Sequence, residues 1–210
     1  MNQIFDFFFS QYETYSVTDT NLEIVAVIFG FLSVWFSKQN KIWVFPTGMI
    51  STAIFVYLLM KWELLGDMMI NAYYFIMSVY GWYIWTRKID ETHVTPISWT
   101  TKKDQKIGIG IFLATLIFVY LVYKNFDKWT SWVAYADTFT TAIFFVGMWL
   151  MAKRKIENWL FWIAGNIISV PLYFYKGFTF TSFQYFGFTF IAIFGYIAWK
   201  KSLNNKPQTS

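Results

Sequence analysis

The sequence predicts an all-α membrane protein with seven transmembrane helices, arranged as two parallel three-helix repeats joined by a linker helix (3+1+3). The first observation is composition: 57% of the 210 residues are hydrophobic and 14% are charged, against about 45–50% and about 25% in soluble domains. The second is a set of seven apolar spans, and the third is an internal duplication. Because a helix in lipid satisfies its own backbone hydrogen bonds, a helical bundle follows.

The seven spans are each close to the roughly 20 residues that a bilayer crossing requires. They run through about 22–37, 42–60, 66–86, 107–123, 133–151, 157–175 and 180–199. We expect an outer-surface N-terminal segment (1–21), a first triple-helix repeat (22–87), a cytoplasmic loop (88–106), a linker helix (107–123), a second triple-helix repeat (133–201) and a cytoplasmic tail (202–210). The N-terminal segment lacks a basic n-region and a cleavage site, so it does not resemble a signal peptide.

The duplication appears as matched residues in the two repeats. In the first helices of the repeats the offset is 114, which pairs Glu23 with Asp137 and Trp35 with Trp149. In the second helices it is 116, which pairs Trp43 with Trp159, Phe45 with Phe161 and Tyr57 with Tyr173. In the third helices it is 114 again, which pairs Gly81 with Gly195, Trp85 with Trp199 and Arg87 with Lys201. The shift in the second helices predicts a two-residue insertion in a loop. A single linker helix gives both repeats the same orientation, an arrangement found in small-solute transporters.

The basic residues predict the orientation in the membrane. All of the 17 Lys and Arg residues except Lys61, Lys124, Lys128 and Lys176 fall on one side of the spans. The positive-inside rule therefore puts the N-terminus outside and the C-terminus in the cytoplasm. The net charge of +5 follows from this topology, and nucleic acid is not expected as a partner. Most tryptophans near span ends, such as Trp35, Trp85 and Trp199, are expected in the interfacial belt, and a minority could line a cavity.

Four spans have a polar and aromatic face at the helical period. These faces hold Asp67, Asn71, Tyr74 and Ser78 in the third span, Asp137, Thr140 and Thr141 in the fifth, Trp159, Trp162, Asn166 and Tyr173 in the sixth, and Gln184 and Tyr185 in the seventh. Such a face is unfavourable against lipid. It should point toward a wet cavity or a partner helix.

The pattern Trp159-x-x-Trp162-x-x-x-Asn166 is the most specific of these features. An amide midway through a span needs a hydrogen-bond partner, and two indoles on the same face suit a planar cationic or aromatic ring that carries hydroxyls. The alternative is structural: the Asn bonds a neighbouring helix and the Trps belong to the belt. Spacing alone leaves both open.

Three acids lie near the outer ends of spans. Glu23 and Asp137 occupy equivalent positions in the two repeats, and Asp67 opens the third span. They could attract a cationic substrate or bind a coupling proton. Alternatively, they complement the dipole at a helix start.

The segment Glu157-Asn-Trp-Leu-Phe-Trp-Ile-Ala-Gly-Asn166, continued by Pro171-Leu-Tyr-Phe-Tyr-Lys-Gly177, resembles the PnuC family of vitamin transporters. So do Trp43-Val-Phe-Pro46-x-Gly48 and Gly81-Trp-Tyr-Ile-Trp85, and the resemblance covers roughly residues 20–201. It implies a fold like that of the SWEET sugar transporters and facilitated uptake of nicotinamide riboside, with thiamine or riboflavin in some members. It also implies that the vitamin is trapped by phosphorylation inside, and that Trp159, Trp162 and Asn166 contact it.

Two further spans would complete such a site. Asn71 and Tyr74 in the third span and Gln184 and Tyr185 in the seventh lie at similar depth. Their neutral hydrogen-bonding groups suit ribose hydroxyls. Bonds between helices are the alternative for each of them.

Several chemistries are not expected. The chain has no cysteine, no Gly-rich nucleotide loop and no histidine other than His93, in a polar loop. No metal, cofactor or catalytic activity is therefore expected. We expect an inner-membrane facilitator of nicotinamide riboside that works by alternating access, with the lipid bilayer and a cytoplasmic vitamin kinase as partners. A homo-oligomer is compatible with the sequence. The alternatives are a thiamine carrier of the same fold, a non-transporting membrane sensor or a membrane-embedded enzyme.

Overall fold

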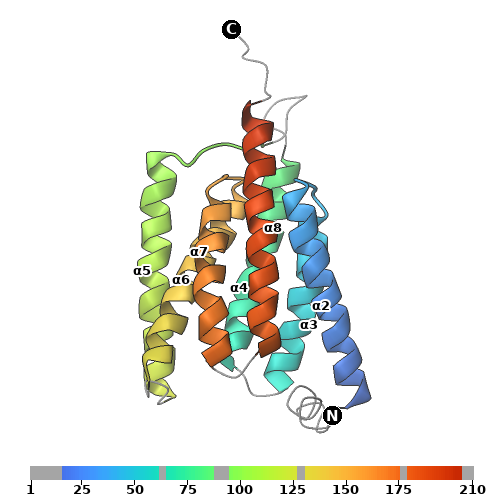
Figure 1. Ribbon diagram of the computed structural model, residues 1–210, viewed down its shortest axis with the longest axis vertical. Helices are drawn as coiled ribbons and strands as arrows, with labels where there is room; N and C mark the ends of the chain where they lie inside the picture. The colour runs from blue at the N-terminus through green and yellow to red at the C-terminus, as the bar shows by residue number, and fades with distance from the viewer. Residues whose placement is uncertain (1–15, 62–64, 88–94, 127–130, 176–178, 205–210) are drawn as a thin grey trace.

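The structure is a computed structural model that describes residues 16–61, 65–87, 95–126, 131–175 and 179–204. The predicted N-terminal surface segment, His93 and most of the tail lie largely outside these residues. The described part forms α2 (Val17–Lys38), α3 (Val44–Lys61), α4 (Leu65–Thr86), α5 (Lys102–Asn125), α6 (Trp132–Ala152), α7 (Asn158–Tyr175) and α8 (Thr179–Asn204). Figure 1 shows these helices side by side along one axis, with the start of α2 and the end of α8 at opposite ends of the bundle.

The helices confirm the predicted all-α membrane fold. By length and composition, α2, α3, α5, α6 and α8 qualify as membrane spans within the described part of the chain. The other two, α4 and α7, contain many of the polar and aromatic residues discussed below, which lower mean hydropathy. No strand is found in the described residues, where Ser98 and Lys155 form an isolated bridge.

Six helices form a closed ring. Contacts run from α2 to α3, α3 to α4, α4 to α6, α6 to α7, α7 to α8 and α8 back to α2. The linker α5 packs on the outside of this ring against α6 and lies at the edge of the bundle in Figure 1. The predicted 3+1+3 arrangement is therefore confirmed, with a closed ring built from both repeats.

The two repeats match at a single offset. Ser37 and Met151, which contact each other, lie 114 residues apart, and the same spacing relates the starts of α3 and α7 at Val44 and Asn158. After the caps of α2 and α6, Asn40 and Arg154 both have positive φ, 57° and 58°. The predicted two-residue shift in the second helices is therefore wrong.

Packing explains why pairing tryptophan with tryptophan gave the wrong offset for the second helices of the two repeats. Phe45, not Trp43, is the structural equivalent of Trp159. A Cβ on Gly81 would lie 2.3 Å from the Phe45 ring, and one on Gly195 would lie 2.6 Å from the Trp159 ring. Each ring thus fills the space that a glycine leaves on the third helix of its repeat. Two different aromatic side chains serve one packing role.

One end of the bundle is closed by two equivalent contacts, in each of which a tryptophan of one repeat donates a hydrogen bond to the backbone of the other repeat. Trp85 Nε1 donates to the Met151 carbonyl at 3.3 Å, and Trp199 Nε1 donates to the Ser37 carbonyl at 3.0 Å. The Ser37 hydroxyl also donates to Met151 Sδ at 3.4 Å. We call this set of contacts the closed end. It lies toward the C-terminal end of α8, at the top of Figure 1.

The closed end corrects the expectation for two belt tryptophans. Trp85 and Trp199 are 4% and 1% exposed because their indoles join the two repeats. Arg154 adds to this junction: its Nη2 donates to Asn40 Oδ1 at 2.8 Å, and its guanidinium lies 4.4 Å from the Trp85 ring. Burial lowers the pKa of Arg154 to about 10, so the side chain is still charged at neutral pH.

The linker helix begins earlier than expected, at Lys102 rather than at 107. Thr101 and Asp104 form a capping box that satisfies the first amides of α5. The segment before it is held against the turn between α6 and α7, where the Thr100 amide donates to Glu157 Oε1 at 2.8 Å. Lys155 pairs with Asp104 at 3.2 Å. Part of the predicted polar loop 88–106 is therefore ordered structure at the closed end.

Candidate functional site

A central cavity of about 460 Å³ lies between the two repeats. All six ring helices line it, and the linker α5 does not. The predicted residues on its wall are Asn71 and Tyr74 of α4, Trp159, Trp162 and Asn166 of α7, Gln184 and Tyr185 of α8, and Glu23 of α2. Three of the four predicted faces, those of α4, α7 and α8, thus meet at this cavity, and the predicted residues Asp137, Thr140 and Thr141 of α6 do not line it.

The remaining predicted residues lie elsewhere. Asp67, Asp137 and Tyr173 line a second cavity of about 480 Å³, away from the closed end. The two cavities share Asn71, Tyr74, Phe144 and Tyr185 as wall residues. The predicted set is therefore divided between two neighbouring cavities.

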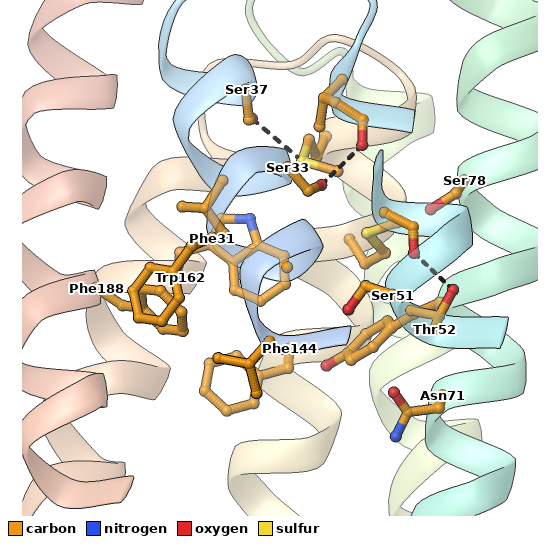
Figure 2. A pocket seen from close by; sticks show the side chains of 18 of the residues that line it. Phe31, Ser33, Ser37, Ser51, Thr52, Asn71, Ser78, Phe144, Trp162 and Phe188 are labelled. Carbon is orange, nitrogen blue, oxygen red and sulfur yellow. Dashed lines mark hydrogen bonds between the residues drawn. The ribbon is translucent and has the colours of Figure 1, made fainter. Parts of the chain in front are cut away.

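Aromatic rings form one side of the central cavity. Trp162 stacks near Phe144 with ring centroids 5.5 Å apart, and Phe31 meets Phe188 at 5.0 Å. Figure 2 shows these four side chains together on one side. Except for Phe31, they come from the second repeat. Flat apolar faces of this kind suit a planar ring, and a cationic ring above all.

Hydroxyl and amide groups form the opposite side. Figure 2 shows Ser51, Thr52, Asn71 and Ser78 there, with Ser33 nearby. Thr52 Oγ1 donates to the Gly48 carbonyl at 2.8 Å, and Ser33 Oγ donates to the Val44 carbonyl at 2.7 Å. Both oxygens keep lone pairs that can accept a hydrogen bond from a ligand. This side belongs to the first repeat and suits a polyhydroxyl group.

The two sides differ because, at equivalent positions of the two repeats, one repeat has a small residue where the other has a large ring. Gly30 and Ser51 of the first repeat correspond to Phe144 and Gly165 of the second. A Cβ on Gly30 would lie 3.2 Å from Ser51 Oγ, whereas one on Gly165 would lie 2.3 Å from the Phe144 ring. The same helix contact is thus filled by small residues in one repeat and by glycine with a large ring in the other.

A second exchanged pair has the same effect. Gly48 of the first repeat corresponds to Trp162 of the second, and Ser33 corresponds to Gly147. A Cβ on Gly48 would lie 3.0 Å from Ser33 Oγ, and a Cβ on Gly147 would lie 3.6 Å from the Trp162 ring. The helical period of the sequence did not single out Ser33, Ser51, Thr52, Phe31 and Phe144, which also line the cavity. Alignment at a uniform offset of 114 would have found most of them, because it sets Gly30 against Phe144 and Gly48 against Trp162.

Two side chains of the α7 pattern are almost fully buried beside the cavity. Trp159 is 2% and Asn166 is 3% exposed. The Trp159 indole nitrogen has no hydrogen-bond partner in the part of the chain that the structure describes. None of the side-chain hydrogen bonds between described residues involves the Asn166 amide, so the interhelical alternative finds no support there. The α7 pattern thus places two polar groups without a partner among the described residues beside the cavity.

The sequence relatives of the chain are membrane transporters. The chain is 24% identical over 212 residues to the nicotinamide riboside transporter PnuC of Escherichia coli strain K12, covering 88% of this chain and 87% of the relative. It is 23% identical over 179 residues to the riboflavin/roseoflavin transporter RibM of Streptomyces davaonensis, covering 84% and 83%. Both of these relatives are transporters by name.

A solved structure has the same fold. The crystal structure of the vitamin B3 transporter PnuC matches with a TM-score of 0.64 and 23% identity, covering 90% of this chain and 84% of that chain. A family model described as nicotinamide mononucleotide transporter matches residues 20–201, which include every helix of the ring almost completely. The chain therefore belongs to the nicotinamide mononucleotide transporter family and is a multi-pass membrane transporter rather than an enzyme.

Proposed function

We propose that this protein is a facilitator of nicotinamide riboside uptake in the bacterial inner membrane. The observation that carries the proposal is the two-sided central cavity. Nicotinamide riboside joins a planar cationic pyridine ring to a ribose, and the cavity offers aromatic faces on one side and hydroxyl and amide groups on the other. The volume of about 460 Å³ falls in the usual range for small-molecule sites, about 300–1,000 Å³. The names of the PnuC relatives support the same substrate.

In this proposal the pyridine ring stacks on Trp162 and Phe144, and the ribose faces Thr52 and Asn71. Asn166 donates or accepts a hydrogen bond near the junction of ring and sugar. Tyr74, Tyr185 and Gln184 complete the enclosure. A ring cation on an indole face is stabilised by about 0.5–2 kcal/mol, more as water is excluded.

Two other vitamins are alternatives. RibM, a relative of similar identity, is a riboflavin/roseoflavin transporter, and riboflavin also combines a planar ring with hydroxyls. Thiamine offers a cationic thiazolium ring but no ribose. Competition among the three vitamins for binding to the purified protein ranks them, and only nicotinamide riboside uses both sides of the cavity with a positive charge.

Transport is proposed to proceed by alternating access. The two repeats meet through crossed contacts at the closed end, Trp85 with Met151 and Trp199 with Ser37. Rocking of the repeats about the bound vitamin would break these contacts and open the cavity to the side on which α8 ends. Since each contact has its counterpart in the other repeat, both are expected to open together.

We predict that net movement needs no energy source within the protein. The cavity offers neutral amides, hydroxyls and aromatic faces, and Glu23 is the acid on its wall. Purified protein in liposomes should exchange labelled nicotinamide riboside at equal rates with symmetric and asymmetric pH. A vitamin kinase and ATP enclosed in the liposomes should convert exchange into accumulation by trapping the phosphorylated product.

Protein-free liposomes with enclosed kinase are the control for leakage. Accumulation above the external concentration, driven by an imposed pH or sodium gradient without kinase, would contradict the facilitator. It would instead assign Glu23 or Asp137 a coupling role.

The orientation is a separate prediction. The bias of basic residues toward one side puts the C-terminus in the cytoplasm. Green fluorescent protein fused after residue 210 should therefore fluoresce in cells, and alkaline phosphatase at the same position should be inactive. The first reporter is active only in the cytoplasm and the second only outside, so each orientation gives a positive signal from one of them. Phosphatase activity without fluorescence would refute the predicted orientation.

A further inference from the structure

We propose that the second cavity is a second substrate-binding site, which holds the organic cation before it enters the central cavity. We call it the acidic chamber, after Asp67 and Asp137 on its wall. This inference rests on the proposed function and adds a step to it. The chamber lies between α4, α5, α6, α7 and α8, near the ends of these helices that are away from the closed end.

The carboxylates of the chamber come from both repeats. Asp67 lies in the first turn of α4, and Asp137 lies in the second turn of α6. The Tyr123 hydroxyl lies 3.4 Å from Asp137 Oδ2, and both acids are close enough to Tyr173 to interact with its hydroxyl electrostatically. Two formal negative charges therefore face one space of about 480 Å³, which is far larger than a single metal ion or proton requires.

A buried hydroxyl gives independent evidence for a ligand. Ser169 of α7 lines the chamber and is 1% exposed, and its Oγ has no hydrogen-bond partner among the residues that the structure describes. A buried polar group without a partner costs about 1–3 kcal/mol. A ligand hydroxyl in the chamber would satisfy it.

Further hydroxyls make the chamber suited to a polyhydroxylated cation. Thr140 and Thr141 donate to backbone carbonyls of α6 at 2.9 and 2.8 Å, so their oxygens can accept from a ligand. The carboxylates accept as well, and they favour positive charge. The central cavity combines aromatic faces with hydroxyls, whereas the chamber combines acids with hydroxyls. Both match parts of one molecule, a sugar that carries a cationic heterocycle.

The residues shared by the two cavities indicate the sequence in which a substrate would occupy them. Tyr74, Phe144 and Tyr185 face both cavities, and the rings of Phe144 and Tyr185 lie nearly parallel, 6.0 Å apart. In this proposal a molecule moves from the chamber to the central cavity past these rings. The chamber is thus the first site and the central cavity the second.

Electrostatics defines what the chamber would do. A cleft lined by one sign of charge raises the local concentration and the on-rate of an opposite charge by about 10- to 1,000-fold. The chamber should therefore bind the cation weakly and in a salt-sensitive manner, because exposed charges are screened within about 3 Å at 1 M salt and about 10 Å at 0.1 M.

The test is calorimetric titration of the full-length purified protein with nicotinamide riboside. At about 20 mM salt we expect two binding events, and at about 0.5 M salt the weaker event should fall at least tenfold in affinity while the stronger one changes little. The double variant Asp67→Asn/Asp137→Asn should lose the weaker event and keep the stronger. Asp19→Asn, which removes an acid that pairs with Lys61 outside both cavities, should keep both events.

The outcomes separate this inference from the proposed function. A single salt-insensitive event in the wild-type protein would overturn the chamber and leave the central site intact. Two events that both survive in the double variant would also overturn it. Absence of any binding would contradict both proposals. The wild-type salt series needs no variant, so misfolding of the double variant cannot mask the answer.

Discussion

Joining the two repeats at the closed end is expected to stop transport completely and reversibly. The change is Ser37→Cys with Met151→Cys, two positions whose side chains meet at 3.4 Å across the repeats. The chain has no other cysteine. Oxidation, or a short bifunctional thiol reagent, should hold the repeats together at this end, so that the cavity can no longer open there. Exchange of labelled nicotinamide riboside in liposomes should fall to the level of protein-free liposomes, and a reductant should restore it when the link is a disulfide.

Each single-cysteine variant, treated in the same way, is the matched control and should retain exchange. Labelling of the remaining free thiols reports how much protein has been linked. If fully linked protein still exchanges the vitamin, the repeats do not separate at this end and alternating access through it is wrong. The linked protein should still bind the vitamin, because the crossed contacts of Trp85 and Trp199 are those of the unlinked structure.

The second large effect concerns the α7 pattern. Asn166→Leu removes an almost fully buried amide, and Trp162→Ala removes a ring that stacks near Phe144. Each loss is expected to weaken binding of nicotinamide riboside by about 1–3 kcal/mol, the usual scale for a lost buried hydrogen bond or stacking partner. That corresponds to roughly 5- to 150-fold in Kd. Calorimetry or thermal-shift titration of the purified variants measures it.

Trp35→Phe is the matched control for these variants. Trp35 is 47% exposed and does not line the cavity among the residues described, so affinity should stay nearly unchanged. Thermal unfolding without ligand separates lost binding from lost stability. An equal loss of affinity in all three variants would mean that α7 does not present the binding face.

The helix content, the 3+1+3 arrangement and the inward faces of α4, α7 and α8 could be predicted from the sequence. The reason is local. Residues that face lipid must be apolar, so the polar residues of each span lie together on one face of the helix. Asn71 with Tyr74 and Trp162 with Asn166 share such faces, and the structure brings both pairs to the same cavity. The sequence therefore placed these four residues on inward faces before any contact between helices was known.

Tertiary structure decided what each inward residue meets. Trp35 and Trp85 are both tryptophans near span ends, yet one is 47% and the other 4% exposed, because only Trp85 faces the other repeat. Phe45 corresponds to Trp159 because each fills the space beside a glycine on another helix, and residue type alone does not reveal that. The division into two cavities has the same cause. It depends on how rings from different helices, such as Tyr74 and Phe144, pack between the central cavity and the acidic chamber, and such contacts are formed only when the helices of both repeats close into a ring.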